Sequence, residues 1–207
     1  MRLVEGPDDV AEGAAWLSAR DARMARAVAL CAPLPLRRRE DGFAALASAI
    51  VSQQVSTASA AAIWARCEGA GLTEADAVRC AADDILRQAG LSRPKQRYLR
   101  ALAEAGIDYE VLRRAPDEEV IATLVAVPGI GRWTAEIYAM FSLGRRDVFA
   151  AGDLALQEAA RRLYGLERRP TERELRERAQ AWSPWASVAA RALWAYYRLE
   201  TGREGAA

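Results

Sequence analysis

The chain has 207 residues, of which 52% are hydrophobic and 28% are charged, and its formal net charge is +1. These values are typical of a globular protein large enough to bury a core, and they exclude a chain that is disordered throughout. The near-neutral charge argues against a protein that coats DNA, but a few local phosphate contacts need no strong basic field.

Two residue types are absent or nearly absent, and this restricts the chemistry. Because the chain has no histidine, Ser-His-Asp triads, His-ligated zinc and histidine bases are excluded. Lys95 is the only lysine, so a Schiff base would need this residue or the terminal amine. The three cysteines (Cys31, Cys67 and Cys80) are irregularly spaced and predict neither a disulfide framework nor a zinc or iron–sulfur site.

Apolar residues recur at three- and four-residue spacing along most of the chain, which predicts helices. The predicted helical segments, in chain order, are residues 10–31, 43–67, 98–105, 120–127, 135–143, 154–166 and 188–199. Thr171 and Glu174 form the pattern of a capping box at the start of a further helix. No alternating strand pattern competes, so the expected fold is all-α, with some ten short helices.

The most informative segment is the turn 128–131, Pro-Gly-Ile-Gly, between two predicted helices. The proline stops the first helix, and Gly129 and Gly131 permit backbone angles that other residues avoid. The next helix begins at Arg132 or just before it. Its first amides favour an anion such as a DNA phosphate, and Arg132 and Thr134 could add contacts. The alternative is an ordinary turn between two antiparallel helices.

Asp153 follows Gly131 by 22 residues and directly precedes a predicted helix. On local sequence it is a helix N-cap, because an aspartate side chain accepts hydrogen bonds from the first amides of a helix. The same amides favour the ionised carboxylate. Such an anion stabilises the oxocarbenium character that a sugar gains when its N-glycosidic bond breaks. We therefore expect Asp153 both to cap the helix and to act in catalysis.

The run 127–135, Val-Pro-Gly-Ile-Gly-Arg-Trp-Thr-Ala, resembles the hairpin of the helix-hairpin-helix DNA glycosylase superfamily, and most of all its bacterial 3-methyladenine DNA glycosylase II branch. Residues 147–149 and Asp153 stand where that family has its loop and its catalytic aspartate. Residues 50–56 resemble the segment whose wedge enters the DNA stack, and residues 182–185 with Trp194 resemble its C-terminal aromatic segment. The resemblance extends from about Phe43 to Tyr197.

The resemblance implies a single glycosylase domain over residues 1–207, with two helical lobes and the helix-hairpin-helix motif at the cleft between them. The implied middle lobe is 43–126, the terminal lobe is 1–42 plus 135–207, and the motif covers 117–142. The β-rich N-terminal domain of longer relatives is not expected.

The resemblance also implies a base pocket and a wedge. Trp133 and Trp194 are expected to line the pocket, since a cationic base is attracted to aromatic faces. Core packing is the alternative for both and the default for the other tryptophans (Trp16, Trp64, Trp182 and Trp185). Because Ile137 and Leu154 replace aromatic residues of many relatives, the pocket could be more open.

The expected wedge is Gln54, with Gln53 beside it, filling the gap that a flipped nucleotide leaves. A pair of solvated helix residues is the alternative. The resemblance further implies phosphate contacts at Gly129, Gly131, Arg132 and Thr134. It also implies a monovalent cation (Na⁺ or K⁺) on three backbone carbonyls, those of Val125, Val127 and Ile130.

The expected function is that of a monofunctional DNA glycosylase, which flips and excises alkylated, cationic bases such as 3-methyladenine during base excision repair. Trp133 stands where the strand-cleaving branches carry their Schiff-base lysine, so no lyase activity is expected. The alternatives are another base specificity (uracil, mismatched or oxidised bases), a non-enzymatic DNA-binding module, and a purely structural helical protein.

Partners and location follow from the same reasoning. The expected partner is double-stranded DNA containing a damaged base, bound by a monomer. No cofactor is expected to be required, and the hairpin cation is an optional ligand. No apolar run is long enough to span a bilayer, and residues 1–7 lack the apolar core of a signal peptide. A cytoplasmic protein is therefore expected, associated with the nucleoid in a prokaryote.

Overall fold

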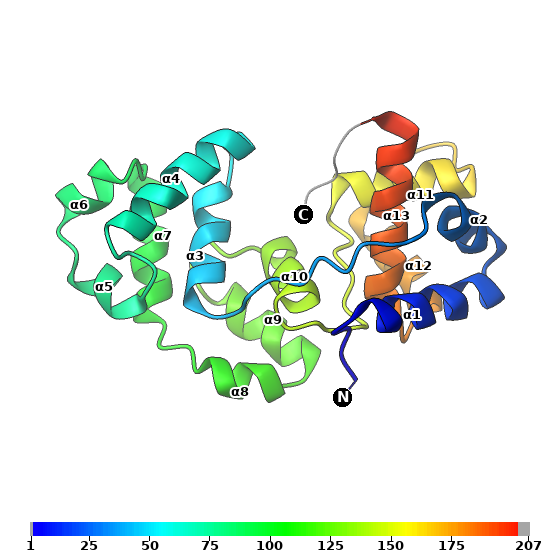
Figure 1. The fold of residues 1–207 in the computed structure, drawn as a ribbon, viewed down its shortest axis with the longest axis horizontal. Helices are drawn as coiled ribbons and strands as arrows, with labels where there is room; N and C mark the ends of the chain where they lie inside the picture. The colour runs from blue at the N-terminus through cyan, green and yellow to red at the C-terminus, as the bar shows by residue number, and fades with distance from the viewer. Residues whose placement is uncertain (1, 203–207) are drawn as a thin grey trace. The chain divides into compact units, whose positions relative to one another are not determined.

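The computed structural model describes residues 2–202 (Figure 1), and these form thirteen α-helices and one short 3₁₀ helix. Apart from an isolated bridge between Leu3 and Arg145, this part of the chain contains no β structure. The expected all-α fold is confirmed, with more helices than the sequence predicted. None of the helices within 2–202 has both the length and the apolarity needed to cross a membrane.

The chain divides into two compact units. The middle unit is Arg39–Tyr138, and the terminal unit combines the chain up to Arg38 with the chain from Ala139 onward. The predicted lobes were 43–126 and 1–42 plus 135–207, so the observed boundaries differ by several residues. The second boundary falls inside a helix, α10 (Arg132–Phe141), rather than in the turn that precedes it.

Helix α13 (Ala186–Thr201) is the centre of the terminal unit, where it packs against α1, α2, α11 and the 3₁₀ helix η1 (Figure 1). All residues from Ala186 to Tyr196 are buried, and the many alanines among them allow neighbouring helices to approach closely. The surrounding elements are α1 (Pro7–Arg20), α2 (Ala22–Cys31), α11 (Leu154–Tyr164), α12 (Glu172–Ala179) and η1 (Gln180–Trp182). The predicted capping box is confirmed, because Thr171 and Glu174 exchange hydrogen bonds at the start of α12.

Asp21 divides the predicted helix 10–31 into α1 and α2, so the expectation of one helix was wrong. Its side chain caps α2 by accepting hydrogen bonds from the amides of Arg23 and Met24. It also accepts hydrogen bonds from the Tyr164 hydroxyl and the Trp182 indole. Burial opposes the charged form, but these hydrogen bonds outweigh it and lower the pKa of Asp21 below its ordinary value.

The middle unit is organised around α7 (Arg93–Glu104), which packs against α3, α5 and α6 (Figure 1). Its buried side chains lie on one face, as expected for an amphipathic helix. This helix was predicted to begin at residue 98 but begins five residues earlier, at Arg93. Pro94 does not prevent the earlier start, because proline is compatible with the first turn of a helix. The other helices of this unit are α3 (Phe43–Ser52), α4 (Thr57–Gly69), α5 (Ala75–Cys80), α6 (Asp83–Gln88), α8 (Tyr109–Arg114) and α9 (Asp117–Val125).

A turn of four residues, 53–56, interrupts the predicted helix 43–67 and separates α3 from α4. We call it the glutamine turn. Ser56 caps α4 by accepting a hydrogen bond from the Ser59 amide. The break was missed because the apolar spacing continues across it and only a serine marks the new helix start. The interpretation of Gln53 and Gln54 as solvated helix residues is therefore wrong.

Candidate functional site

The turn between α9 and α10 spans residues 126–131, and two buried apolar side chains hold it in place. Val127 and Ile130 are each 4% exposed, and the Ile130 amide donates a hydrogen bond to the Val127 carbonyl at 3.0 Å. Helix α10 then begins at Arg132, as predicted. The turn therefore presents the start of α10 in a fixed orientation within the middle unit.

The two glycines of this turn have different roles. Gly129 has a φ of +92°, and a Cβ placed there would lie 2.4 Å from Cγ of Tyr98 on α7. Glycine is thus required both by the backbone angle and by the close approach of the tyrosine ring. Gly131 has no such angle, and a Cβ added to it would meet no atom within 4 Å, so only Gly129 uses the backbone freedom that both glycines permit. Gly131 instead leaves the backbone bare at an exposed position.

The predicted phosphate-binding side chains differ in their availability. Arg132 is 44% exposed, although its Nε donates to Oε1 of the buried Glu136 at 2.9 Å and its Nη2 lies 3.8 Å from Glu118. The guanidinium is therefore oriented by carboxylates but remains open to solvent. Thr134 is only 7% exposed, and this burial disfavours the direct phosphate contact that we expected from its hydroxyl.

The two glutamines of the glutamine turn have different environments. Gln54 is exposed and has a φ of +56°, a left-handed angle that non-glycine residues rarely adopt. Such angles occur where surrounding structure enforces them, often at functional sites. Gln53 is half-buried, and its Nε2 donates a hydrogen bond to the Gly129 carbonyl at 2.9 Å. Gln53 therefore joins the glutamine turn to the hairpin, while the Gln54 side chain is exposed.

Lys95 supports the same region from α7. Its side chain is 8% exposed, and Nζ donates a hydrogen bond to the Val51 carbonyl at 2.6 Å, near the end of α3. Burial lowers the pKa of the Lys95 ammonium. Helix α7 therefore contacts α3 through Lys95 and the hairpin through Tyr98, whose ring lies against Gly129. These supporting roles of Lys95 and Tyr98 were not predicted, because no local pattern in the sequence marks them.

In the terminal unit, Asp153 is the N-cap of α11, as predicted. Its Oδ1 accepts hydrogen bonds from the Ala155 amide at 2.9 Å, the Leu156 amide at 3.0 Å and Nε1 of Trp194 at 3.2 Å. The residue is 3% exposed. A carboxylate oxygen that accepts three N–H donors is held in one orientation.

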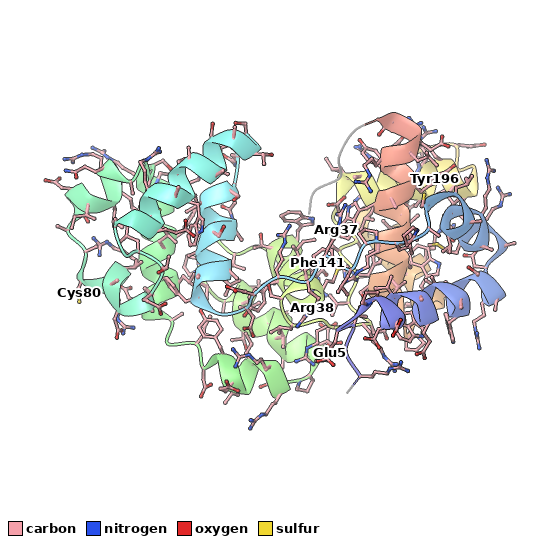
Figure 2. All side chains as sticks on the ribbon, viewed as in Figure 1. Glu5, Arg37, Arg38, Cys80, Phe141 and Tyr196 are labelled. Atoms are coloured by element: carbon pink, nitrogen blue, oxygen red, sulfur yellow. The ribbon has the colours of Figure 1, made fainter. Side chains whose placement is uncertain are left out.

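Trp194 is the α13 residue that the structure brings to Asp153. It is 1% exposed, and its ring packs at a tilt on Phe141, with centroids 5.7 Å apart. The guanidinium of Arg191 lies 4.8 Å from the Phe141 ring. Arg38, labelled with Phe141 in Figure 2, donates to the Phe141 and Ser142 carbonyls. The tryptophan predicted to line a pocket thus orients the carboxylate, a role that a separation of 41 residues could not reveal.

The remaining predicted site residues divide between surface and core. Trp133 lies in the first turn of α10 and is 37% exposed. At the positions where aromatic residues were expected in relatives, Ile137 is buried and Leu154 is 61% exposed. Trp182 and Trp185 are buried in the core, as the default interpretation predicted. Trp16 and Trp64 are only half-buried, so that interpretation is wrong for them.

The three hairpin carbonyls predicted to bind a monovalent cation are not saturated by backbone hydrogen bonds. Within residues 2–202, the carbonyls of Val125 and Ile130 accept no backbone hydrogen bond, and that of Val127 accepts one, from Ile130. A carbonyl oxygen has two lone pairs, so each of the three retains at least one for an ion. By contrast, the Gly129 carbonyl is already engaged by Gln53.

Residues 47–184 match the family model described as HhH-GPD superfamily base excision DNA repair protein. The chain is 30% identical to DNA-3-methyladenine glycosylase 1 of Schizosaccharomyces pombe over 186 residues, covering 86% of this chain and 82% of that protein. It spans 57% of the length of two further curated relatives.

Two solved structures are similar over most of both chains. The S. pombe 3-methyladenine DNA glycosylase Mag1, in complex with abasic DNA, superimposes with a TM-score of 0.77 at 30% identity, covering 90% of this chain and 95% of that one. A DNA-3-methyladenine glycosidase from Bacillus halodurans gives a TM-score of 0.79 at 33% identity, covering 98% and 94%. The chain belongs to the HhH-GPD superfamily of base excision DNA repair proteins.

Proposed function

We propose that this protein is a monomeric DNA glycosylase that excises alkylated, cationic bases such as 3-methyladenine during base excision repair. The observation that carries this proposal is the buried carboxylate of Asp153, held by two helix amides and Trp194. A fixed anion at this position stabilises the positive charge that develops on the deoxyribose as the base departs.

The reaction requires little beyond this carboxylate when the base is cationic. The N-glycosidic bond breaks, its electron pair leaves with the base, and the base departs neutral without needing a proton. Water then adds its oxygen to C1′ and releases a proton, which leaves an abasic site in an intact strand. In this proposal Asp153 stabilises the sugar cation and orients the water, and the exposed indole of Trp133 attracts the cationic base.

DNA positioning is assigned to the middle unit. The hairpin backbone at Gly129 and Gly131, together with the open guanidinium of Arg132, contacts phosphates, and Gln54 enters the stack where the nucleotide has left it. The carbonyls of Val125, Val127 and Ile130 would hold a sodium or potassium ion. The ion would add positive charge beside the phosphate contact.

One experiment tests the function directly. The protein is incubated with methylated duplex DNA, and free bases are separated and identified. Release of 3-methyladenine is expected, with 7-methylguanine as a second product. Release of neither base would contradict the proposal. Parallel duplexes containing uracil, a mismatch or an oxidised base test the alternative specificities.

The absence of lyase activity is a separate prediction. Borohydride reduction during turnover should trap no covalent protein–DNA adduct. The only lysine, Lys95, is buried, and its Nζ donates a hydrogen bond to the Val51 carbonyl. The measurement is a denaturing gel of labelled duplex, with a strand-cleaving glycosylase as positive control. An adduct that disappears in Lys95→Met would show that this amine reacts.

Substitutions at the two glutamines should separate the wedge from its support. Gln54→Ala should reduce base release by roughly tenfold, about 1.4 kcal/mol, because nothing fills the gap after flipping. Gln53→Met keeps the size of the side chain but loses the donor to Gly129, and should weaken binding to abasic duplex without abolishing release.

The fluorescence of 2-aminopurine beside the lesion measures flipping in these variants. Gln88→Ala, on the exposed surface of α6, is the matched control. If Gln53→Met reduces flipping as strongly as Gln54→Ala, or more, the assignment of Gln54 as the wedge is wrong.

A further inference from the structure

A basic groove lies along the start of α7 in the middle unit. It has a volume of about 790 Å³, and four arginines contribute to its lining. The lining residues are Asp83, Arg87, Arg93, Pro94, Gln96, Arg97 and Arg100. The loop that precedes α7 is anchored at this groove, because the Gln96 side chain donates a hydrogen bond to the Leu91 carbonyl at 2.8 Å. None of the roles proposed above involves this groove.

The charge of the groove contrasts with that of the unit that contains it. Residues 39–138 include 11 basic and 14 acidic side chains, a net charge of −3. Residues 85–103, in contrast, contain five basic side chains and no acidic one. A general requirement for solubility does not concentrate one sign of charge in this way. A local positive field in a net acidic unit attracts anions to that surface.

Two of the four arginines are committed to the fold and two are available. Arg100 donates to the Ala81 carbonyl at 2.8 Å and to Asp83 at 2.6 Å, and Arg87 donates to Asp84 at 2.6 Å. Arg93 and Arg97 are exposed, and within residues 2–202 neither side chain makes a hydrogen bond or ion pair. Their spacing of four residues places them on the same side of α7.

The groove shares helix α7 with the residues that support the elements proposed to position DNA. Helix α7 carries Arg93 and Arg97. It also carries Lys95, which bonds to α3, and Tyr98, which lies against Gly129 of the hairpin. Arg93 and Arg97 lie on the exposed face of this helix, where a phosphodiester backbone can approach them. Guanidinium groups bind phosphate through paired N–H donors. Pro94 is the only apolar residue of the lining, whereas a protein partner would favour an apolar centre.

We propose that Arg93 and Arg97 bind the phosphodiester backbone of the DNA duplex at a position outside the lesion. This inference rests on the proposed function, because it takes duplex DNA as the ligand. The contacts supply affinity rather than chemistry, and they compensate for the small net charge of the whole chain.

The first test is the salt dependence of binding to a duplex that contains a stable abasic analogue. Each lost phosphate contact should reduce the slope of log K against log salt by about 0.9, so Arg93→Gln/Arg97→Gln should reduce it by about 2. The control is Arg114→Gln/Arg169→Gln, which removes the same charge from exposed positions outside the groove. An equal change in both double variants would overturn the proposal, because only bulk charge would then matter.

The second test locates the phosphate. Methylphosphonate groups neutralise one backbone position of the duplex at a time. At one or two positions outside the lesion, neutralisation should weaken binding by wild type but not by Arg93→Gln/Arg97→Gln. If no position behaves in this way, the groove does not bind DNA, and an acidic protein partner becomes the better hypothesis. If wild type binds the abasic duplex but releases no base, the catalytic proposal fails while this test still gives a result.

Discussion

Replacement of Asp153 by asparagine should lower the rate of base release by at least roughly 100-fold, as is found when a preorganised electrostatic group is removed from an active site. Asparagine retains an oxygen that can accept the hydrogen bonds of the Ala155 and Leu156 amides and of the Trp194 indole. Since Asn and Asp cap helices about equally well, the fold should persist. What is lost is the negative charge opposite the developing sugar cation.

A second aspartate provides a matched control for this variant. Asp21 is also an N-cap that accepts hydrogen bonds from two helix amides and from an indole, that of Trp182. Asp21→Asn therefore reports the structural cost of losing a charged cap away from the chemistry. It is the more demanding case, because Oδ2 of Asp21 also accepts hydrogen bonds from Tyr164 and Trp182. Single-turnover release from methylated duplex measures the rate, and thermal unfolding measures stability. A folded Asp153→Asn variant that releases bases at the wild-type rate would remove Asp153 from the mechanism.

Gly129→Ala should destabilise the protein by about 2–5 kcal/mol, and Gly131→Ala should have little effect on stability. At Gly129 an alanine meets two penalties, a left-handed backbone angle and a clash with Tyr98, which together have this order of magnitude. At Gly131 a methyl group meets neither. The same substitution at two positions of one turn thus shows whether stability depends on the backbone angle and packing at Gly129 or on any added methyl group in the turn.

The comparison is made by denaturant unfolding and by affinity for abasic duplex. Gly129→Ala should lose both, because the clash displaces the carbonyl to which Gln53 is bonded. Gly131→Ala should stay folded, and any loss of affinity would then report the approach of a phosphate to that exposed backbone. If both variants unfold alike, the distinction between the two glycines is wrong.

The parts of the fold that the sequence predicted are those with strong local signals. The helical periodicity, the Thr171 capping box and the start of α10 after Gly131 all depend on residues within a few positions of one another. The Asp153 cap is of the same kind, because the accepting oxygen and the donating amides are three residues apart or fewer. Such features are independent of the rest of the chain.

The features that were missed are those in which distant residues decide the outcome. The break between α3 and α4 was hidden because apolar spacing continues across residues 53–56, and the Gln53 side chain finds its acceptor 76 residues away. The Trp194 indole reaches Asp153 over 41 residues, and Lys95 reaches Val51 over 44. Periodicity and motif spacing carry no information about such pairings, which depend on how the helices pack.

The solitary lysine has a practical consequence. Because Lys95 is the only side-chain amine of the chain and its Nζ is held on the Val51 carbonyl, reagents that acylate amines can modify it only when the junction of α3 and α7 opens. The rate at which mass spectrometry detects acylation of this residue therefore measures how often that junction opens in the native protein. DNA bound across the glutamine turn should slow this labelling. Acylation of Lys95 therefore measures local opening of the native protein without an engineered probe.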